Sequence, residues 1–203
     1  TALTAAGKTI AIGEGALKAV ASQDGTIAIG YSALNALTSG AGNTALGYQS
    51  MLVHTTGGNN TGLGYQTMDD TNADSNSLGS ISNTFIGQGA GGGTWGAGAS
   101  NYNCTLGAGT LSGALTAALG NVAIGISAGN NLTGAGGAGQ GSYNVLIGYD
   151  AQCDDANGIN QIVIGKEAVG QGDNTATIGD GYITAVYMSD AKTAMIHGYG
   201  LQV

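Results

Sequence analysis

A five-residue cassette that ends in Ile-Gly or Leu-Gly recurs along most of the chain and constrains its fold more than any other feature. In the copy at 26–30, Ile27 and Ile29 alternate with smaller residues, the pattern of a short, half-buried strand. The closing glycines are 17, 17, 17, 23, 20, 18, 23, 17 and 14 residues apart. Such a period, repeated so often, predicts stacked coils of a solenoid. The copies are 9–13, 26–30, 43–47, 60–64, 83–87, 103–107, 121–125, 144–148, 161–165 and 175–179.

Each coil is expected to contain two short strands and two turns. The closing glycine either adopts a positive φ or lies where a neighbouring backbone passes too close for a Cβ. A second short strand is expected at 31–34 and at the matching place in later coils. Tyr31, Tyr48 and Tyr65 follow the glycine in successive copies, with Gln49 and Gln66 beside two of them, so we expect stacked ladders. The Asn that opens six cassettes is expected to bond turn backbone.

Composition excludes several classes of protein. Among 203 residues there are 40 Gly, no Pro and only four Lys plus Arg, with a formal net charge of −8. Too few cations are present to neutralise phosphates, so nucleic-acid binding is not expected. The glycines lack the collagen period, and no apolar run reaches the roughly 20 residues of a membrane-spanning helix.

The predicted coil is thin and needs further burial of apolar surface. We expect the Ile and Leu of the cassettes to fill a narrow core, yet one or two such residues per coil offset little ordering entropy. A symmetric parallel homo-oligomer with a shared core is therefore expected, although the period does not fix the number of chains. The predicted repeat core, with its closing glycines, is Ile27, Ile29, Gly30, Leu46, Gly47, Leu63, Gly64, Ile86, Gly87, Leu106, Gly107, Ile124, Gly125, Ile147, Gly148, Ile164, Gly165, Ile178 and Gly179.

The stretches NTALGYQSM, NNTGLGYQTM, NVAIGISAG and NVLIGYDA resemble the head repeats of trimeric autotransporter adhesins and the related repeats of phage tail fibres. The resemblance covers roughly 9–181. It implies an all-β parallel β-roll of about ten short coils, intertwined as a parallel homotrimer. It also implies an extracellular fibre used for attachment, on a virion tail or on a bacterial surface. The adhesin heads keep a spacing near 14, whereas most intervals here are longer and carry loops, as in the tail-fibre relatives.

Three segments are expected along the chain. Residues 1–8 form a lead-in, 9–181 the repetitive roll, and 182–203 a C-terminal β cap or transition element. Within the last segment, 182–188 is a predicted strand. The chain starts at Thr1 without Met, so we expect a fragment or a processed product.

The long intervals predict surface loops at 68–82, 91–102 and 130–143, where a receptor is expected to bind. Trp95, the single Trp, and Tyr102 are the candidate receptor contacts. For Trp95, however, a loop anchor that packs on the roll is the preferred interpretation. The expected partners are further copies of the chain and, where a receptor is bound, a host surface glycan or protein.

Chemical sites are weakly indicated. Asp70, Asn72 and Asp74 place oxygen atoms at alternate positions, as a calcium loop does, but Ser75 and Ile81 replace the expected Gly and Glu. A solvated acidic turn is the preferred interpretation, and no metal, cofactor or membrane insertion is expected. Cys104 and Cys153 are expected to be free, buried thiols. No catalytic constellation recurs, so an enzyme is not expected.

Alternatives to the fibre segment remain. One is a filament-forming extracellular subunit whose roll ends stack. Another is an ice-binding β-solenoid, which needs arrays of Thr on its outer face. The positions taken as outward, among them Ala28, Ala45, Gly62 and Phe85, vary too much for such an array.

Overall fold

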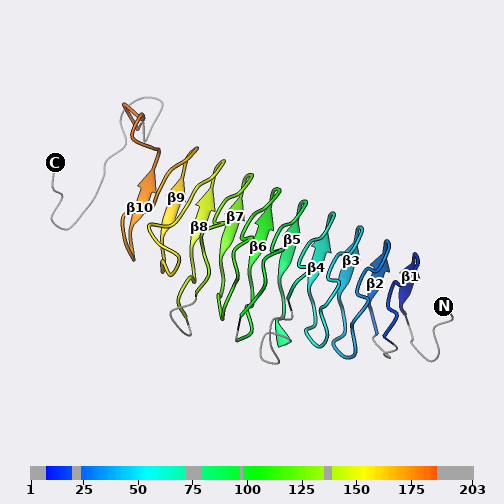
Figure 1. The fold of residues 1–203 in the computed structure, drawn as a ribbon. Coiled ribbons are helices and arrows are strands. Elements are labelled where there is room, and N and C mark those ends of the chain that lie inside the picture. Colours follow the sequence, from blue (N-terminus) through cyan, green and yellow to red (C-terminus); the bar gives the residue numbers. More distant parts are fainter. Residues whose placement is uncertain (1–7, 20–23, 72–78, 97, 135–138, 187–203) are drawn as a thin grey trace.

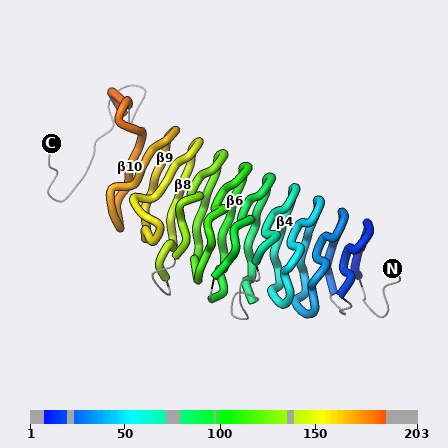
Figure 2. Tube along the Cα trace, in the orientation of Figure 1, coloured from blue at the N-terminus to red at the C-terminus, as the bar shows by residue number. Residues whose placement is uncertain are grey.

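The computed structural model describes residues 8–19, 24–71, 79–96, 98–134 and 139–186. They form an all-β stack of coils that follow one another in sequence order. Each coil adds one strand to a single parallel sheet (Figures 1 and 2). The predicted solenoid is therefore confirmed. The strands are β1 (Ile10–Ile12), β2 (Ile27–Ile29), β3 (Thr44–Leu46), β4 (Thr61–Leu63), β5 (Thr84–Ile86), β6 (Cys104–Leu106), β7 (Val122–Ile124), β8 (Val145–Ile147), β9 (Ile162–Ile164) and β10 (Ala176–Ile178).

Every strand pairs with the next in strict register, so equivalent cassette residues form columns. Ile12 lies beside Ile29, and Ile29 beside Leu46. The closing glycines have φ between 89° and 144°. At Gly30 and Gly47 a Cβ would also overlap the carbonyl oxygen of the next closing glycine. Both reasons for glycine therefore hold at once, and a side chain here is excluded by conformation and by space.

The predicted second strand is wrong. Residues 31–34 form a turn, and Ser32 and Leu34 have φ of 54° and 48°. Gln49 and Met51 repeat this geometry in the next coil, with φ of 54° each. Alternate residues in left-handed conformation bend the backbone instead of extending it. Neighbouring coils still bond through this wall, as from the Met51 N–H to the Thr67 carbonyl at 2.8 Å.

The interior of one coil holds the middle residue of each strand, not its flanking Ile and Leu. The middle position is buried in β2 to β9, whereas the first and third positions are partly or well exposed. The prediction that the cassette Ile and Leu fill the coil is therefore wrong for a single chain. Positions such as Ala28 and Ala45, taken as outward, point inward and are fully buried. A coil this thin has room for only one side chain per strand, and usually a small one.

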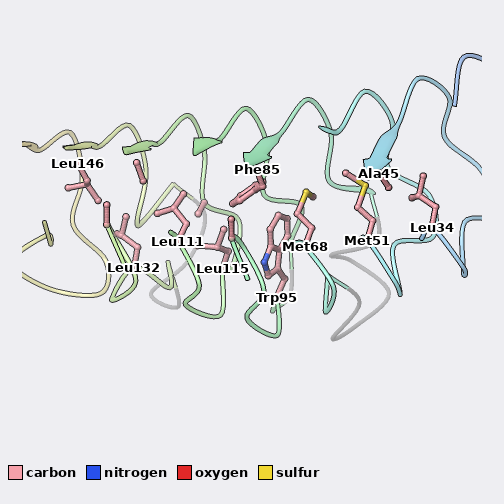
Figure 3. Close-up of a cluster of buried hydrophobic side chains, with 14 of the residues drawn as sticks. Leu34, Ala45, Met51, Met68, Phe85, Trp95, Leu111, Leu115, Leu132 and Leu146 are labelled. Atoms are coloured by element: carbon pink, nitrogen blue, oxygen red, sulfur yellow. The ribbon is translucent and has the colours of Figure 1, made fainter. Parts of the chain in front are cut away.

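Large and small residues compensate each other across the interior (Figure 3). Gly62 lies in the strand of coil 4, and a Cβ there would come within 3.0 Å of the end of the buried Met51 side chain. Coil 5 has Phe85 in its strand, and a Cβ at Gly91 would collide with the Phe85 ring. Trp95 packs against Phe85 with ring centroids 5.8 Å apart. The space beside Gly62 and Gly91 is thus taken by a large side chain, as close packing of the interior requires.

A buried ladder of amide side chains runs along one corner of the solenoid. Each Asn accepts bonds at its Oδ1 from the backbone N–H and the Nδ2 of the Asn one coil further on. Each Nδ2 also donates to a loop carbonyl, which confirms the predicted bonding of turn backbone. The members are Asn43, Asn60, Asn83, Asn103, Asn121 and Asn144, and Gln161 extends the ladder through its N–H.

Beyond β10 the regular structure stops. Residues 182–186 contain no strand, so the strand predicted over 182–188 is wrong for its described part. Tyr182 is 88% exposed. Residues 187–203, the rest of the predicted cap, lie outside the described residues, as do 1–7 of the predicted lead-in.

Candidate functional site

The outer face of the sheet is the most unusual surface of the molecule. We call it the outer ribbon: the first and third residues of the ten strands, which point away from the coil interior. In-register pairing turns these positions into two columns along the solenoid. The third column contains only Ile and Leu: Ile12, Ile29, Leu46, Leu63, Ile86, Leu106, Ile124, Ile147, Ile164 and Ile178. The first column contains Ile10, Ile27, Thr44, Thr61, Thr84, Cys104, Val122, Val145, Ile162 and Ala176.

The outer ribbon is apolar, exposed and free of charge. Leu106 and Ile178 each expose 52% of their surface, and Leu63 exposes 38%. No Asp, Glu, Lys or Arg occurs in either column. Solvent-facing sheets normally alternate apolar residues inward with polar residues outward. Here the inward residues are mostly small and apolar, and large aliphatic residues occupy most of the outward positions as well. Long exposed apolar strips of this kind mark interaction surfaces.

A short aromatic ladder lies beyond the glycine corner, next to the outer ribbon in sequence. The rings of Tyr31, Tyr48 and Tyr65 stack with centroids 5.2 Å apart and interplanar angles of 14° and 7°. Gln66 donates to the Gln49 Oε1 at 3.1 Å beside them. The predicted ladders are thus present. Each ring keeps 44–48% of the residue exposed, so hydroxyls and ring edges face solvent.

Of the two candidate receptor contacts, only Tyr102 is on the surface. Trp95 is fully buried, and its Nε1–H donates to the Gly91 carbonyl at 3.0 Å. Trp95 is therefore the anchor of its loop, and the receptor-contact interpretation is wrong for the folded chain. Tyr102 exposes 60% of its surface and has a φ of 62°. It remains a candidate contact.

The weak calcium candidate gains no support. Asp70 is half-buried and accepts a bond from the Thr94 hydroxyl at Oδ2. Asn72 and Asp74 lie outside the described residues. In the described part of the chain, no three His, Cys, Asp or Glu residues gather where they could hold a metal ion. A helix with the length and apolar character to cross a membrane is also absent from that part.

His54 is a buried member of the interior polar network. Its Nε2 lies 3.1 Å from the Gly57 carbonyl, and its Nδ1 lies 3.2 Å from the Thr71 hydroxyl. Because a carbonyl can only accept, Nε2–H donates to Gly57, and Nδ1 accepts from the Thr71 hydroxyl. A ring with one N–H and one acceptor nitrogen is neutral. Burial lowers the pKa of His54 to about 4. The ring is held neutral because no water reaches it to solvate a charge.

The two cysteines occupy opposite environments. Cys153 is buried, and burial raises the pKa of its thiol to about 12, with Asp154, Asp155 and Asp173 adding to the shift. Cys104 is exposed in the first column of the outer ribbon, so the prediction of two buried thiols is wrong for Cys104. Both are free thiols, as predicted.

Sequence reasoning missed two features of the coil interior, the buried His54 and the packing of large side chains beside glycines. His54 lies 17 residues before Thr71, the dominant repeat interval, so the repeat alone would have placed the two side by side. The pairing of Gly62 with Met51 and of Gly91 with Phe85 was a second available signal. A repeat position whose residues are uncharged but vary in size, with a large residue close to each small one, indicates an interior position.

No family model, curated protein or solved structure matched this chain.

Proposed function

We propose that this chain is a structural fibre segment that associates with copies of itself through the outer ribbon, as a parallel homotrimer, and serves surface attachment. The observation that carries the proposal is the outer ribbon: a continuous, uncharged column of Ile and Leu on an exposed sheet. The resemblance to adhesin heads and phage tail fibres supports the number three and the attachment role. The fibre is extracellular, on a virion tail or a bacterial surface.

A second copy is the occupant that best matches the ribbon. The ribbon follows the whole sheet from β1 to β10, so its partner must present an equally long and straight apolar surface. An identical solenoid, lying parallel, has the same repeat and meets it coil for coil. Burying the exposed half of an Ile or Leu contributes roughly 1 kcal/mol per residue. Many coils together then give a cooperative interface from small, equal contributions.

The ribbon can be tested by one charged substitution with a matched control. Leu106→Asp places a carboxylate in the third column, where association would bury it unpaired. Because Leu106 is 52% exposed in the single chain, the solenoid itself tolerates the change. Tyr143→Asp, at a residue 57% exposed and off the ribbon, is the control. We expect Leu106→Asp to give monomers by light scattering, with unchanged circular dichroism, while Tyr143→Asp assembles normally. Normal assembly of Leu106→Asp would contradict the proposal.

Cys104 offers an independent readout in the wild-type chain. It lies in the first column, two residues before Leu106, and is exposed in a single chain. Association should protect it from a maleimide reagent, and dissociation should release it. Cys153, buried within the coil, serves as the internal reference that reacts only after unfolding. Full reactivity of Cys104 in the assembled protein would place the interface elsewhere.

One observation favours a second candidate, ice binding. The argument against it relied on positions that prove to lie inside the coil. The true outward positions include Thr44, Thr61 and Thr84, which are in register in β3, β4 and β5. This row is one residue wide and borders the Leu and Ile of the third column. A thermal-hysteresis assay tests it directly, and clear activity would replace the attachment role.

A further inference from the structure

The tyrosine ladder ends abruptly at the N-terminal end of the solenoid. Its position in the first coil is occupied by Glu14, because Ile12 pairs with Ile29 and the Ser32 N–H donates to the Glu14 carbonyl at 2.8 Å. Tyr48 stacks on one face of the Tyr31 ring. Since the rings stack along the solenoid, the other face of Tyr31 is directed toward the coil that carries Glu14.

A hollow of about 330 Å³ lies at this break in the ladder. It is close to the lower end of the ~300–1,000 Å³ range of small-ligand sites. The Asn35 Nδ2 donates to the Gly15 carbonyl at 2.9 Å, which fixes the orientation of the Asn35 amide. Tyr31 is held by stacking, so two of the lining groups are pre-positioned. The hollow is lined by Glu14, Gly15, Lys18, Tyr31, Ser32 and Asn35.

The lining combines an aromatic ring with a carboxylate, an ammonium, an amide and a hydroxyl. A tyrosine presents an apolar body with a polar tip. The charged groups form hydrogen bonds about twice as strong as those between neutral partners. A sugar ring has the complementary chemistry, with C–H groups on its face and hydroxyls around its edge. A second hollow near the other end, lined by residues including Glu167, Gln171 and Asp180, lacks an aromatic ring.

We propose that the hollow beside Tyr31 is a saccharide-binding site, in which the sugar lies against the Tyr31 ring and its hydroxyls bond Glu14, Lys18 and Ser32. The inference rests on the proposed attachment role for its biological meaning, since a surface glycan is the natural source of such a ligand. It places the contact on the first two coils of the roll. In a trimer the site would be present three times, so weak single contacts would combine into useful avidity.

The test measures sugar binding directly in the full-length chain. Methyl glycosides of neutral hexoses, N-acetylhexosamines and hexuronic acids are titrated and followed by amide chemical shifts. We expect binding in the millimolar range with shifts confined to the first two coils. Tyr31→Ala should weaken binding about tenfold, and Glu14→Gln about fivefold. Tyr65→Ala is the matched control, because Tyr65 ends the same ladder at its far side and also stacks on one ring.

The outcomes separate this inference from the proposed function. Binding that Tyr31→Ala removes and Tyr65→Ala retains supports the site, whatever mass the protein has in solution. A trimer that binds none of these glycosides overturns the site and leaves the fibre proposal standing. Equal loss in Tyr31→Ala and Tyr65→Ala, or shifts elsewhere on the roll, also overturns it. Binding of a peptide and of no sugar would contradict the ligand class.

Discussion

Asn83 lies in the middle of the buried amide ladder, and its removal should cost most of the stability of the fold. Its Nδ2 donates to the Asn60 Oδ1 at 3.1 Å and to the Ser100 carbonyl at 2.8 Å. Its Oδ1 accepts from the backbone N–H of Asn103 at 3.0 Å and from the Asn103 Nδ2 at 3.1 Å. All these groups are buried, so water cannot replace the lost partner.

The magnitude follows from the groups that Asn83→Ala would leave unpaired. The Asn103 N–H, one Asn103 Nδ2 proton and the Ser100 carbonyl each lose a bond. At ~1–3 kcal/mol for each buried unpaired group, the loss is about 5 kcal/mol. Domains are typically stable by only ~5–15 kcal/mol, so the variant should be close to unfolding.

Urea unfolding monitored by circular dichroism, at one fixed protein concentration, measures the change. Asn130→Ala is the control, because Asn130 is exposed and its Oδ1 accepts one bond, from the Gln152 Nε2 at 2.8 Å. We expect the control to lose less than about 1 kcal/mol. If Asn83→Ala loses no more than Asn130→Ala, the amide ladder is not what secures this corner.

Two further predictions concern single buried positions. Burial lowers the pKa of His54 from 6.5 to about 4, so the unfolded chain binds its proton first as pH falls. Stability should therefore decline from about pH 6.5 and level off below pH 4, by roughly 3 kcal/mol in total. His54→Gln should remove that part of the pH dependence of urea unfolding, and an unchanged slope would contradict it. At Gly47, φ is 144° and a Cβ would overlap the Gly64 carbonyl oxygen. Gly47→Val should thus lower the midpoint of thermal unfolding sharply or prevent folding, and a midpoint equal to wild type would refute the close approach.

The strands and their stacking could be predicted from sequence, because a cassette repeated ten times leaves little choice of register. Its glycine is required both by φ and by the neighbouring backbone, so even the corner was predictable. The second wall of the coil was not, since Ser32 and Leu34 adopt left-handed conformations that their identities do not favour. Tertiary packing of the coil overrides local preference there.

The direction of the strand faces was the main error, and its physical reason is specific. Alternation of Ile27, Ala28 and Ile29 shows that two faces differ but does not say which is inside. Bulky aliphatic residues were assigned to the interior, as in an ordinary sheet. The interior of one thin coil accepts Ala28 instead, and the Ile side chains are left for another partner. In most strands the inward residue is small, but the middle residue is also buried where it is Phe85 or Leu146, so position in the strand decides which face enters the coil.

Trp95 illustrates the same limit for a candidate site. A lone Trp among glycines looks like an exposed binding residue, yet the ring lies inside the coil against Phe85. Gly91 supplies both the room beside Phe85 and the carbonyl that accepts the indole N–H. Depth of burial depends on the three-dimensional path of the loop, which the repeat pattern does not contain.

The absolute mass of the protein in solution tests the central claim most directly. Light scattering over a range of concentrations should give about three times the chain mass of 19.7 kDa, persisting on dilution. A mass of one chain at every concentration would show that the outer ribbon stays exposed to water, and would contradict self-association through it.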